Sequence, residues 1–437
     1  MFLPNLGSKK CLQMLSIEDN ESIPFVDLAF SLYLFTSRLY ETMRARGVRD
    51  LFFLSREGFV LKEMFDYFVR NIENPIPIKT HYLQVSRRST FLPSLGFIGE
   101  ENFRILFRQY RHISLETFVK SLALDEYTSV FIKAMDMDAA DFAQLRKNLP
   151  TDPLLKKLIR LPIFKKLYEK ERKSRSTALT AYIASFSENA LQDTLHVVDV
   201  GWKGSIQDNL FNWLMRVRGS KAKVYGYYVG LVTHGSVSAK NKKHGLLFSN
   251  QTCLTPGFRT FSENRSLFEV LLPARHGSSR SYYLTADGHP QVIQDPFVEQ
   301  EMVETRIMPV VDRIIERFQL IVSALTCSPL SDKELFSVVR SRHWRMVFNP
   351  SQTEIDWILS ISHVENFGTF EKSHFGPVSV QLPFVDRLWF TKDLLIKRGS
   401  VDVGFWPYLT IRQRALFGTS ILYKTLRRLQ EYGGISL

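Results

Sequence analysis

Short apolar runs alternate with helical patterns along the first part of the chain. Residues 25–46 have a helical pattern, which ends at Gly47. Residues 50–54 are mostly apolar and predict a short buried strand, and apolar positions at helical spacing follow over residues 60–68. A turn at residues 55–58 separates the two. The pattern therefore predicts a strand–loop–helix unit.

The same alternation returns further along the chain. Strands are predicted at residues 81–85, 195–199 and 223–231, and the apolar positions of residues 206–214 lie on one helical face. Strands that alternate with helices form parallel sheets with right-handed crossovers. We therefore expect an α/β fold with a parallel sheet.

Long helical patterns lie between and after these units. Residues 102–189 are helical in pattern, with breaks at three prolines, and so are residues 298–326, 332–347 and 411–432. Ser262, Glu263 and Asn264 are expected to cap a helix that continues to Leu271. We expect an α/β core formed by residues 25–100 and 190–290, a helical insertion at 101–189 and a mostly helical C-terminal region at 291–437.

The composition fits a globular protein with a strongly basic surface. The 437 residues suggest two or three domains, and an apolar share of 45% is enough to bury a sizeable core. The formal net charge of +13 favours a phosphorylated ligand, a nucleic acid or an anionic membrane surface. No basic run or nucleic-acid motif is present, so no nucleic-acid partner is expected.

Targeting and cysteine patterns favour a cytoplasmic location. Residues 1–15 lack the order of a signal peptide, and the most apolar run, residues 25–35, is about half the roughly 20 residues that a membrane span needs. Cys11, Cys253 and Cys327 show no zinc or disulfide spacing. Peripheral contact with the inner face of a membrane stays open, because the segment 412–428 is amphipathic. That segment is either an interfacial helix or a packed terminal helix.

Two loops carry the candidate chemistry. Ser55-Arg56-Glu57-Gly58 follows the first predicted strand, and Asp199-Val200-Gly201-Trp202-Lys203-Gly204-Ser205 follows a later one. Ligands of open parallel sheets bind beyond the carboxyl ends of the strands, and the helix N-termini there favour anions. The glycines Gly58, Gly201 and Gly204 would let the backbone approach a ligand. Ser205 is expected either to cap the second helix or to donate to a phosphate.

The charged residues of these loops have a functional and a structural interpretation each. Arg56 and Lys203 are the expected phosphate partners, with Arg87 at the end of the second strand as a further candidate. Asp199 is expected to hold Mg²⁺ or sugar hydroxyls rather than only cap a turn. Glu57 either binds a metal or a ribose hydroxyl or pairs with Arg56. Trp202 either stacks on a ligand ring or fills the core.

The arrangement resembles the type I phosphoribosyltransferase fold. In that family an early strand–loop–helix contacts pyrophosphate, and residues 51–58 look like it. A later acidic strand end leads into a loop that cradles the 5-phosphate of phosphoribosyl pyrophosphate, and residues 197–205 look like that loop. Val198 stands where the family has the first of two acidic residues. Lys203-Gly204-Ser205-Ile206 stands where it has Thr-Gly-x-Thr.

A closer resemblance, over residues 25–290, is to bacterial proteins of polysaccharide biosynthesis that are often labelled haloacid-dehalogenase-like hydrolases. It is carried by residues 53–58, Ser86-Arg87, residues 199–207, Phe268-Glu269 and His276-Gly277-Ser278. Members resemble phosphoribosyltransferases that place ribofuranose 5-phosphate on a glycan, from which a separate phosphatase removes the phosphate. The resemblance implies phosphoribosyl pyrophosphate as donor, Mg²⁺ as cofactor, and an O-antigen, lipopolysaccharide or capsule glycan, lipid-linked or not, as acceptor.

The resemblance also implies roles for individual residues. Catalytic roles fall to Asp199, Lys203, Glu57 and Glu269, and Asp199 is also expected to bind Mg²⁺. Either Glu57 or Glu269 would accept the proton of the acceptor hydroxyl. Donor binding falls to Ser55, Arg56, Gly58, Arg87, Gly201, Trp202, Gly204 and Ser205.

Two other functions stay open. A haloacid-dehalogenase-type phosphatase needs an Asp nucleophile in an Asp-x-Asp-x-Thr run at a strand end. The one similar run, Asp136-Met137-Asp138-Ala139-Ala140, lacks the Thr and lies between predicted helices. The other alternative is a non-catalytic basic protein that binds a membrane surface.

Overall fold

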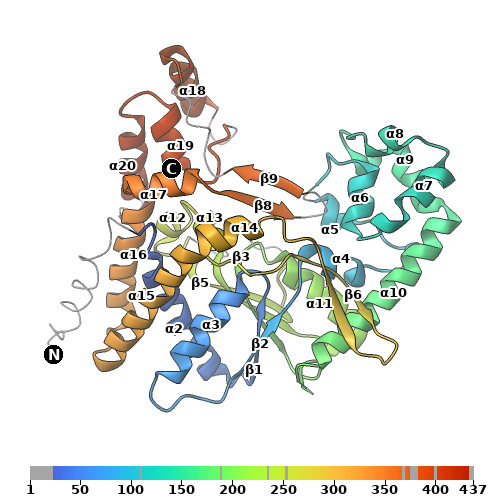
Figure 1. Ribbon diagram of the computed structural model, residues 1–437, viewed down its shortest axis with the longest axis horizontal. Helices are drawn as coiled ribbons and strands as arrows, with labels where there is room; N and C mark the ends of the chain where they lie inside the picture. The colour runs from blue at the N-terminus through green and yellow to red at the C-terminus, as the bar shows by residue number, and fades with distance from the viewer. Residues whose placement is uncertain are drawn as a thin grey trace.

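The centre of the molecule is a five-stranded parallel sheet (Figure 1). The computed structural model describes residues 23–432 except 109, 188, 234–235, 251–253, 367–369, 375–381 and 398–400. The strands lie in the order β2-β1-β3-β4-β5, and every neighbouring pair is parallel. Their bounds are β1 Asp50–Leu54, β2 Lys79–Leu83, β3 Leu195–Trp202, β4 Val224–Leu231 and β5 Asn241–Ser249. The predicted α/β class with a parallel sheet is therefore confirmed.

Helices cover both faces of the sheet, because its central strands are apolar on both sides. Side chains of β1 and β3 point alternately to the two faces. Phe53 and Val198 join the core beneath α2 (Leu28–Arg46), α3 (Gly58–Arg70), α15 (Met308–Cys327) and α16 (Asp332–Phe348). Phe52 and Val197 join the core beneath α10 (Pro162–Ala184) and α11 (Ser205–Arg218). The result is a three-layer sandwich with the sheet in the middle.

A helical lobe with a core of its own projects from one side of the sheet (Figure 1). Its buried apolar residues run from Phe91 to Tyr168 and pack on one another. The lobe is made of α4 (Arg87–Ser94), α5 (Arg104–Phe107), α6 (Leu115–Ser121), α7 (Thr128–Met135), α8 (Ala139–Ala143), α9 (Pro153–Arg160), the 3₁₀ turns at Asp125–Tyr127 and Leu149–Thr151, and the first part of α10.

The rest of the chain adds helices and two antiparallel hairpins. The hairpins are β6 (Ser279–Leu284) with β7 (Pro290–Gln294), and β8 (Ser362–Asn366) with β9 (Phe370–His374). The further helices are α12 (Phe258–Phe261), α13 (Ser266–Val270), α14 (Gln300–Met302), α17 (Gln352–Leu359), α18 (Phe384–Ile396), α19 (Pro407–Arg414) and α20 (Thr419–Tyr432). A π-helical stretch, Val303–Ile307, joins α14 to α15, and a 3₁₀ turn, Gly219–Lys221, follows α11.

Several predicted boundaries were wrong. The second strand begins two residues earlier than 81, because its first residues pair with β1 at the sheet edge. Strand β3 continues to Trp202, through part of the predicted loop. The helix expected from residue 262 begins at Ser266, and its N-cap is Arg265, without a side-chain cap. The predicted terminal helix is two helices, since Ala415 is extended and Gly418 has a φ of +90°. Strand β5 and the hairpins were not predicted.

Among the described residues, no helix is both long enough and apolar enough to cross a membrane. Residues 1–15, on which the expectation of no signal peptide rests, lie outside the described residues, as do Cys11 and Cys253. Cys327, the last residue of α15, is exposed.

Candidate functional site

A cavity of about 310 Å³ lies where β1, β2 and β3 end. At this point the strand order reverses: β1 is followed by β2 on one side, and β3 is followed by β4 and β5 on the other. Ligands of open α/β sheets bind at such a switch point. The lining residues are Ser55, Arg56, Glu57, Val85, Ser86, Arg87, Asp199, Val200, Gly201, Trp202, Lys203, Ser205, Ile206, Val232, Arg265, Ser266, Glu269, Ser278 and Phe405.

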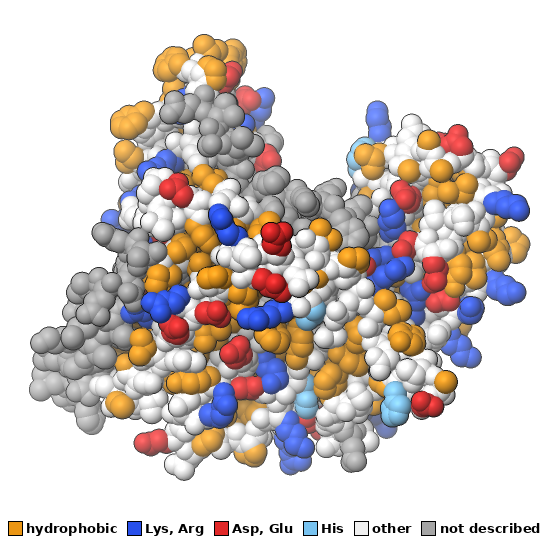
Figure 2. All heavy atoms as spheres, in the orientation of Figure 1, with side chains coloured by type: hydrophobic (Ala, Val, Ile, Leu, Met, Phe, Trp, Pro, Cys, Tyr) orange, Lys and Arg blue, Asp and Glu red, His pale blue; other side chains and the backbone are white. Residues whose placement is uncertain are grey.

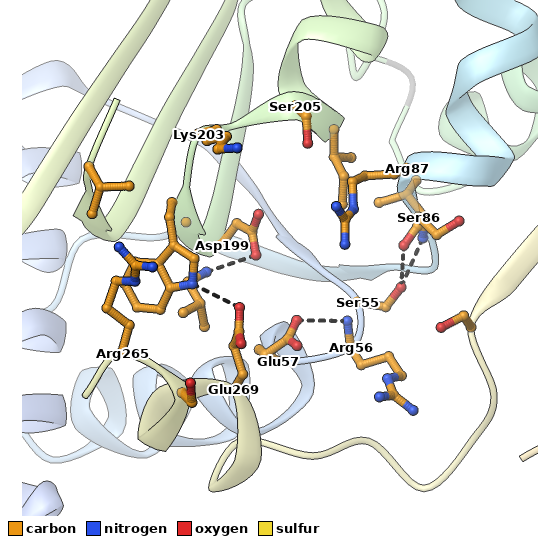
Figure 3. Close-up of a pocket in the computed structure, with 18 of the residues that line it drawn as sticks. Ser55, Arg56, Glu57, Ser86, Arg87, Asp199, Lys203, Ser205, Arg265 and Glu269 are labelled. Carbon is orange, nitrogen blue, oxygen red and sulfur yellow. Dashed lines mark hydrogen bonds between the residues drawn. The ribbon is translucent and has the colours of Figure 1, made fainter. Parts of the chain in front are cut away.

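The two predicted loops share this one cavity (Figure 3). Ten of the twelve candidate residues line it: Ser55, Arg56, Glu57, Arg87, Asp199, Gly201, Trp202, Lys203, Ser205 and Glu269. Gly58 and Gly204 are not among the lining residues. Residues that are more than 140 positions apart in the sequence therefore face the same space.

Three helix N-termini meet at the cavity. Helices α3, α4 and α11 begin at Gly58, Arg87 and Ser205, directly after the loops that follow β1, β2 and β3. The first N–H groups of a helix lack partners within the helix, and its N-terminal end carries partial positive charge. Arg56, Arg87, Lys203 and Arg265 add four cationic side chains to the lining. The site is therefore suited to anionic groups such as phosphates.

Each of the three loop glycines is required for a different structural reason, which the sequence alone did not indicate. Gly201 has a φ of +136°, and a Cβ there would meet the Gly230 carbonyl oxygen at 2.1 Å. Gly204 has a φ of +66° and is the N-cap of α11, so the expectation that Ser205 caps this helix was wrong. At Gly58 a Cβ would lie 2.8 Å from the backbone of Phe53. Gly58 therefore allows α3 to pack closely on β1, and the approach of a ligand to the backbone there stays a prediction.

Ser55 and Arg56 are engaged with protein groups. The Ser55 hydroxyl donates to the Val85 carbonyl (2.7 Å) and accepts from the Val85 N–H (3.0 Å), which ties the β1 loop to the β2 loop. The Arg56 guanidinium forms an ion pair with Glu299 at 2.5 Å and points away from the middle of the cavity (Figure 3). The Arg56 N–H donates to the Glu57 carboxylate at 3.1 Å. The guanidinium thus pairs with Glu299, not with Glu57.

Three carboxylates, those of Asp199, Glu57 and Glu269, line the cavity together with Arg87. Asp199 is buried, and its Oδ1 accepts the Val200 N–H at 2.8 Å. Burial raises the pKa of Asp199 well above its usual value, and the Glu57 and Glu269 carboxylates raise it further, against a smaller opposing effect of Arg87. Such crowding favours either a retained proton or a bound cation.

Trp202 fixes one of these carboxylates. Its Nε1–H donates to Glu269 Oε1 at 2.8 Å. Its ring stacks on Phe248, with centroids 5.8 Å apart, and the Arg265 guanidinium lies 5.7 Å from the ring centre. Trp202 therefore lines the cavity and also packs against the core, and its stacking on a ligand ring stays a prediction.

A buried ion pair holds the loop that carries Lys203. Lys243 of β5 is buried, and its Nζ lies 2.8 Å from Asp208 Oδ1 in the first part of α11. The same Nζ donates to the Lys203 carbonyl oxygen at 3.0 Å. The Lys203 side chain itself is exposed. The backbone at Lys203 is thus fastened to β5, while the residue itself lines the cavity and stays exposed.

Sequence reasoning missed several lining residues: Ser86, Arg265, Ser266, Ser278 and Phe405. Ser86 and Ser278 belong to runs that carried the family resemblance, so a signal for them existed. Arg265 precedes α13, and Phe405 lies in the connection between α18 and α19. Both reach the site only through tertiary folding, and no local pattern marks them.

The candidate phosphatase nucleophile lies elsewhere. Asp136 ends α7 in a left-handed conformation, and Asp138 is the N-cap of α8, where its side chain accepts the Asp141 N–H. Both lie in the helical lobe, after a helix instead of a strand, as the sequence indicated. Neither lines the cavity at the sheet edge.

The described residues contain no cluster of three or more His, Cys, Asp or Glu arranged to hold a metal ion. Mg²⁺ that arrives with a substrate phosphate usually needs only one or two protein carboxylates. Asp199 and Glu57 both line the cavity and are the two carboxylates that would meet that requirement. A comparison of the chain with protein-family models gave no match, and neither did a comparison with curated proteins.

Proposed function

We propose that this protein is a phosphoribosyltransferase that moves ribofuranose 5-phosphate from phosphoribosyl pyrophosphate to a bacterial surface glycan. The observation that carries the proposal is the shared cavity at the switch point. Three helix N-termini, the cationic side chains of Arg87, Lys203 and Arg265, and three carboxylates surround it. The phosphoribosyltransferase-like character of the core and its resemblance to polysaccharide-biosynthesis proteins are part of the proposal. We place the reaction in the cytoplasm, at the inner face of the membrane.

The two sides of the cavity suit the two charged ends of the donor. The loops after β1 and β2 offer Arg87 and the N-termini of α3 and α4, and the loop after β3 offers Lys203, Ser205 and the N-terminus of α11. We assign the pyrophosphate to the first group and the 5-phosphate to the second. Arg87 donates to two oxygens at once, whereas Lys203 acts as a point charge.

The chemistry needs no covalent nucleophile. The bond from the anomeric carbon to pyrophosphate breaks as the bond to the acceptor oxygen forms, through an oxocarbenium-like state. The proton of the acceptor hydroxyl passes to a carboxylate, Glu269 or Glu57. Glu269 is the better positioned of the two, because Trp202 holds one of its oxygens. Cationic groups that are already in place stabilise the leaving pyrophosphate.

Asp199 and Glu57 are the residues that would hold Mg²⁺. Bound there, the ion would neutralise part of the charge of the pyrophosphate. Without a cation, burial and, to a smaller extent, the neighbouring Glu57 carboxylate raise the pKa of Asp199. Asp199 also lies where it can accept hydrogen bonds from ribose hydroxyls.

Calorimetric titration with phosphoribosyl pyrophosphate and Mg²⁺ tests donor binding. We expect saturable binding to the wild-type protein, weakened about tenfold by Lys203→Ala because one charge contact is lost. Lys221→Ala removes an exposed cation at the far end of α11 and should leave binding unchanged. Absence of heat at millimolar donor in the wild-type protein would refute the proposal.

A transfer assay with labelled donor and isolated surface glycan tests the reaction. Asp199→Asn should abolish transfer, whereas Asp136→Asn should leave it intact. If Asp136→Asn instead abolished the release of phosphate from sugar phosphates, the phosphatase alternative would replace this proposal.

A further inference from the structure

The outer face of α18 is apolar and exposed. Seen along the helix, its large hydrophobic side chains fall on one side, within an arc of about 140° at 100° per residue. The side chains of this face are Phe384, Val385, Leu388, Trp389, Leu395 and Ile396. Phe384 is 71% exposed and Trp389 is 55% exposed. The opposite face is partly buried toward α19, where the Thr391 hydroxyl accepts the Leu416 N–H.

Helix α20 repeats this arrangement. Its inner face is fastened by Tyr423, whose hydroxyl donates to the buried Glu263 at 2.9 Å. Its outer face exposes Ile421, Leu422, Leu426 and Leu429, and Phe417, just before the helix, is 98% exposed. In Figure 1 both helices belong to the projection at the upper left of the molecule, and Figure 2 shows hydrophobic side chains gathered over it. We call these two outer faces the apolar projection.

Basic residues accompany the apolar projection. The described residues from 382 to 432 include eight Lys or Arg and four Asp or Glu, within a chain of net charge +13. Lys392 lies in the middle of the apolar arc of α18, with its Nζ 4.4 Å from the centre of the Trp389 ring. A Trp and a Lys set among Leu, Ile and Phe are typical of helices that lie at a membrane interface.

We propose that the apolar projection binds the surface of an anionic lipid bilayer. Apolar side chains of α18 and α20 enter the boundary between headgroups and acyl chains, while Lys392 and the neighbouring basic residues stay at the headgroups. The helices lie on the bilayer and do not cross it, in keeping with the lengths of the described helices. This inference is independent of the proposed reaction.

Charge favours a bilayer over a second copy of the chain. In a symmetric dimer the same patch would face itself, so the excess of basic residues would be placed against an equal excess. An anionic surface complements that charge.

Flotation of the full-length chain with vesicles tests the proposal. We expect it to rise with vesicles that contain phosphatidylglycerol, to rise less with pure phosphatidylcholine, and to be released in part by high salt. The double variant Phe384→Glu/Trp389→Glu should bind about tenfold or more weakly, because two apolar anchors become charged. The control Leu145→Glu/Val298→Glu makes the same charge change at equally exposed positions elsewhere and should float like the wild type.

Two outcomes would overturn the proposal. The first is that the wild type stays at the bottom of the gradient with anionic vesicles. The second is that both double variants float equally well. Sedimentation velocity tests the competing occupant, a second copy of the chain. If the wild type were a dimer that did not float, and only Phe384→Glu/Trp389→Glu dissociated it, the face would be a dimer interface. Far-ultraviolet circular dichroism verifies that each variant is folded.

Discussion

At the residue scale, the burial of Asp199 among other carboxylates makes the stability of the protein depend on pH. Its pKa is raised above 3.8, so the folded protein holds this proton more tightly than the unfolded chain does. The contribution of Asp199 to the free energy of unfolding therefore becomes less favourable as the pH rises above 3.8. Asp199→Asn removes that cost, because the amide is neutral at every pH.

We expect Asp199→Asn to melt at a higher temperature than the wild type at pH 7, and the gap to close as the pH falls toward 4. The same variant should lack transfer activity. Thermal melts across this pH range measure the gap. Asp136→Asn, at an exposed position, is the control for the dependence of melting temperature on pH. A difference in melting temperature for Asp199→Asn that did not change with pH would contradict the raised pKa of Asp199.

A second residue-scale prediction concerns the hydrogen bond from Trp202 to Glu269. Trp202→Phe keeps a ring against Phe248 but removes the N–H donor. We expect a loss of about 1–2 kcal/mol in the free energy of unfolding and about a tenfold lower kcat, because Glu269 is no longer held in place. Glu269→Gln keeps an acceptor for Trp202 and should preserve stability while it lowers kcat. Equal kcat in all three proteins would exclude a role for Glu269 in proton transfer.

At the element scale, strand β5 holds the loop that carries Lys203. Removing Lys243 leaves the Asp208 carboxylate without its buried ammonium and the Lys203 carbonyl without a donor. We expect Lys243→Met to lose about 3–5 kcal/mol in urea unfolding and to weaken donor binding. The double variant Lys243→Met/Asp208→Asn should recover part of the stability, since no unpaired charge remains. If the loss of stability in the double variant instead equalled the sum of the losses in Lys243→Met and Asp208→Asn measured singly, the result would contradict the pairing of the two side chains.

The C-terminal helices are attached to the core through a buried carboxylate. Glu263 accepts hydrogen bonds from the Tyr408 N–H and the Tyr423 hydroxyl, both at 2.9 Å. Burial raises its pKa from 4.5 to about 7, and the Arg427 guanidinium offsets only part of that rise. Because the folded pKa is the higher one, stability falls as the pH rises from 4.5 through about 7.

Glu263→Gln should therefore flatten this pH dependence. At pH 5 we expect the variant and the wild type to unfold at similar urea concentrations. At pH 8 we expect the variant to be more stable by up to about 3 kcal/mol. A wild-type protein that gained stability between pH 5 and pH 8 relative to Glu263→Gln would show that Arg427 outweighs burial.

The elements that could be predicted were those with a local signature. Strands β1 and β3 are short apolar runs followed by glycine-bearing turns and helical patterns, so periodicity alone indicated them. Strand β5 begins Asn241-Lys242-Lys243-His244, which looks polar until the Lys243–Asp208 pair buries it. The β6–β7 hairpin carried an Asp287-Gly288 turn signal, which was overlooked.

In the site, too, the features with a local signature could be predicted, and those that depend on tertiary packing could not. Adjacent residues of a loop could be assigned to a strand end, and the rule for parallel sheets then brought the two loops together. The partner of Arg56 could not be predicted, because Glu299 is 243 positions away. The same holds for Phe405, which enters the cavity from a connection between two C-terminal helices. Side-chain pairing across such separations depends on tertiary packing, which no local pattern encodes.

At the scale of the whole molecule, the C-terminal region contributes to both proposed surfaces. Helix α18 carries part of the apolar projection, and the connection from α18 to α19 places Phe405 in the lining of the cavity. A protein that rests on a bilayer through α18 and α20 would thus be held at the surface that carries a lipid-linked glycan. Membrane contact would then act by raising the local concentration of acceptor, not by changing the chemistry.

The separate roles of the apolar projection and the cavity can be measured with two forms of one acceptor. With a lipid-linked glycan in anionic vesicles, Phe384→Glu/Trp389→Glu should lower the rate of transfer about tenfold, in line with weaker binding to the bilayer. With the same glycan released from its lipid, the rate should match that of the wild type, because neither residue lines the cavity. Phe405→Ala should lower both rates, since it alters the cavity itself. Equal losses with both acceptors in the double variant would mean that α18 acts on the site through its connection to Phe405, and that the bilayer does not concentrate the acceptor.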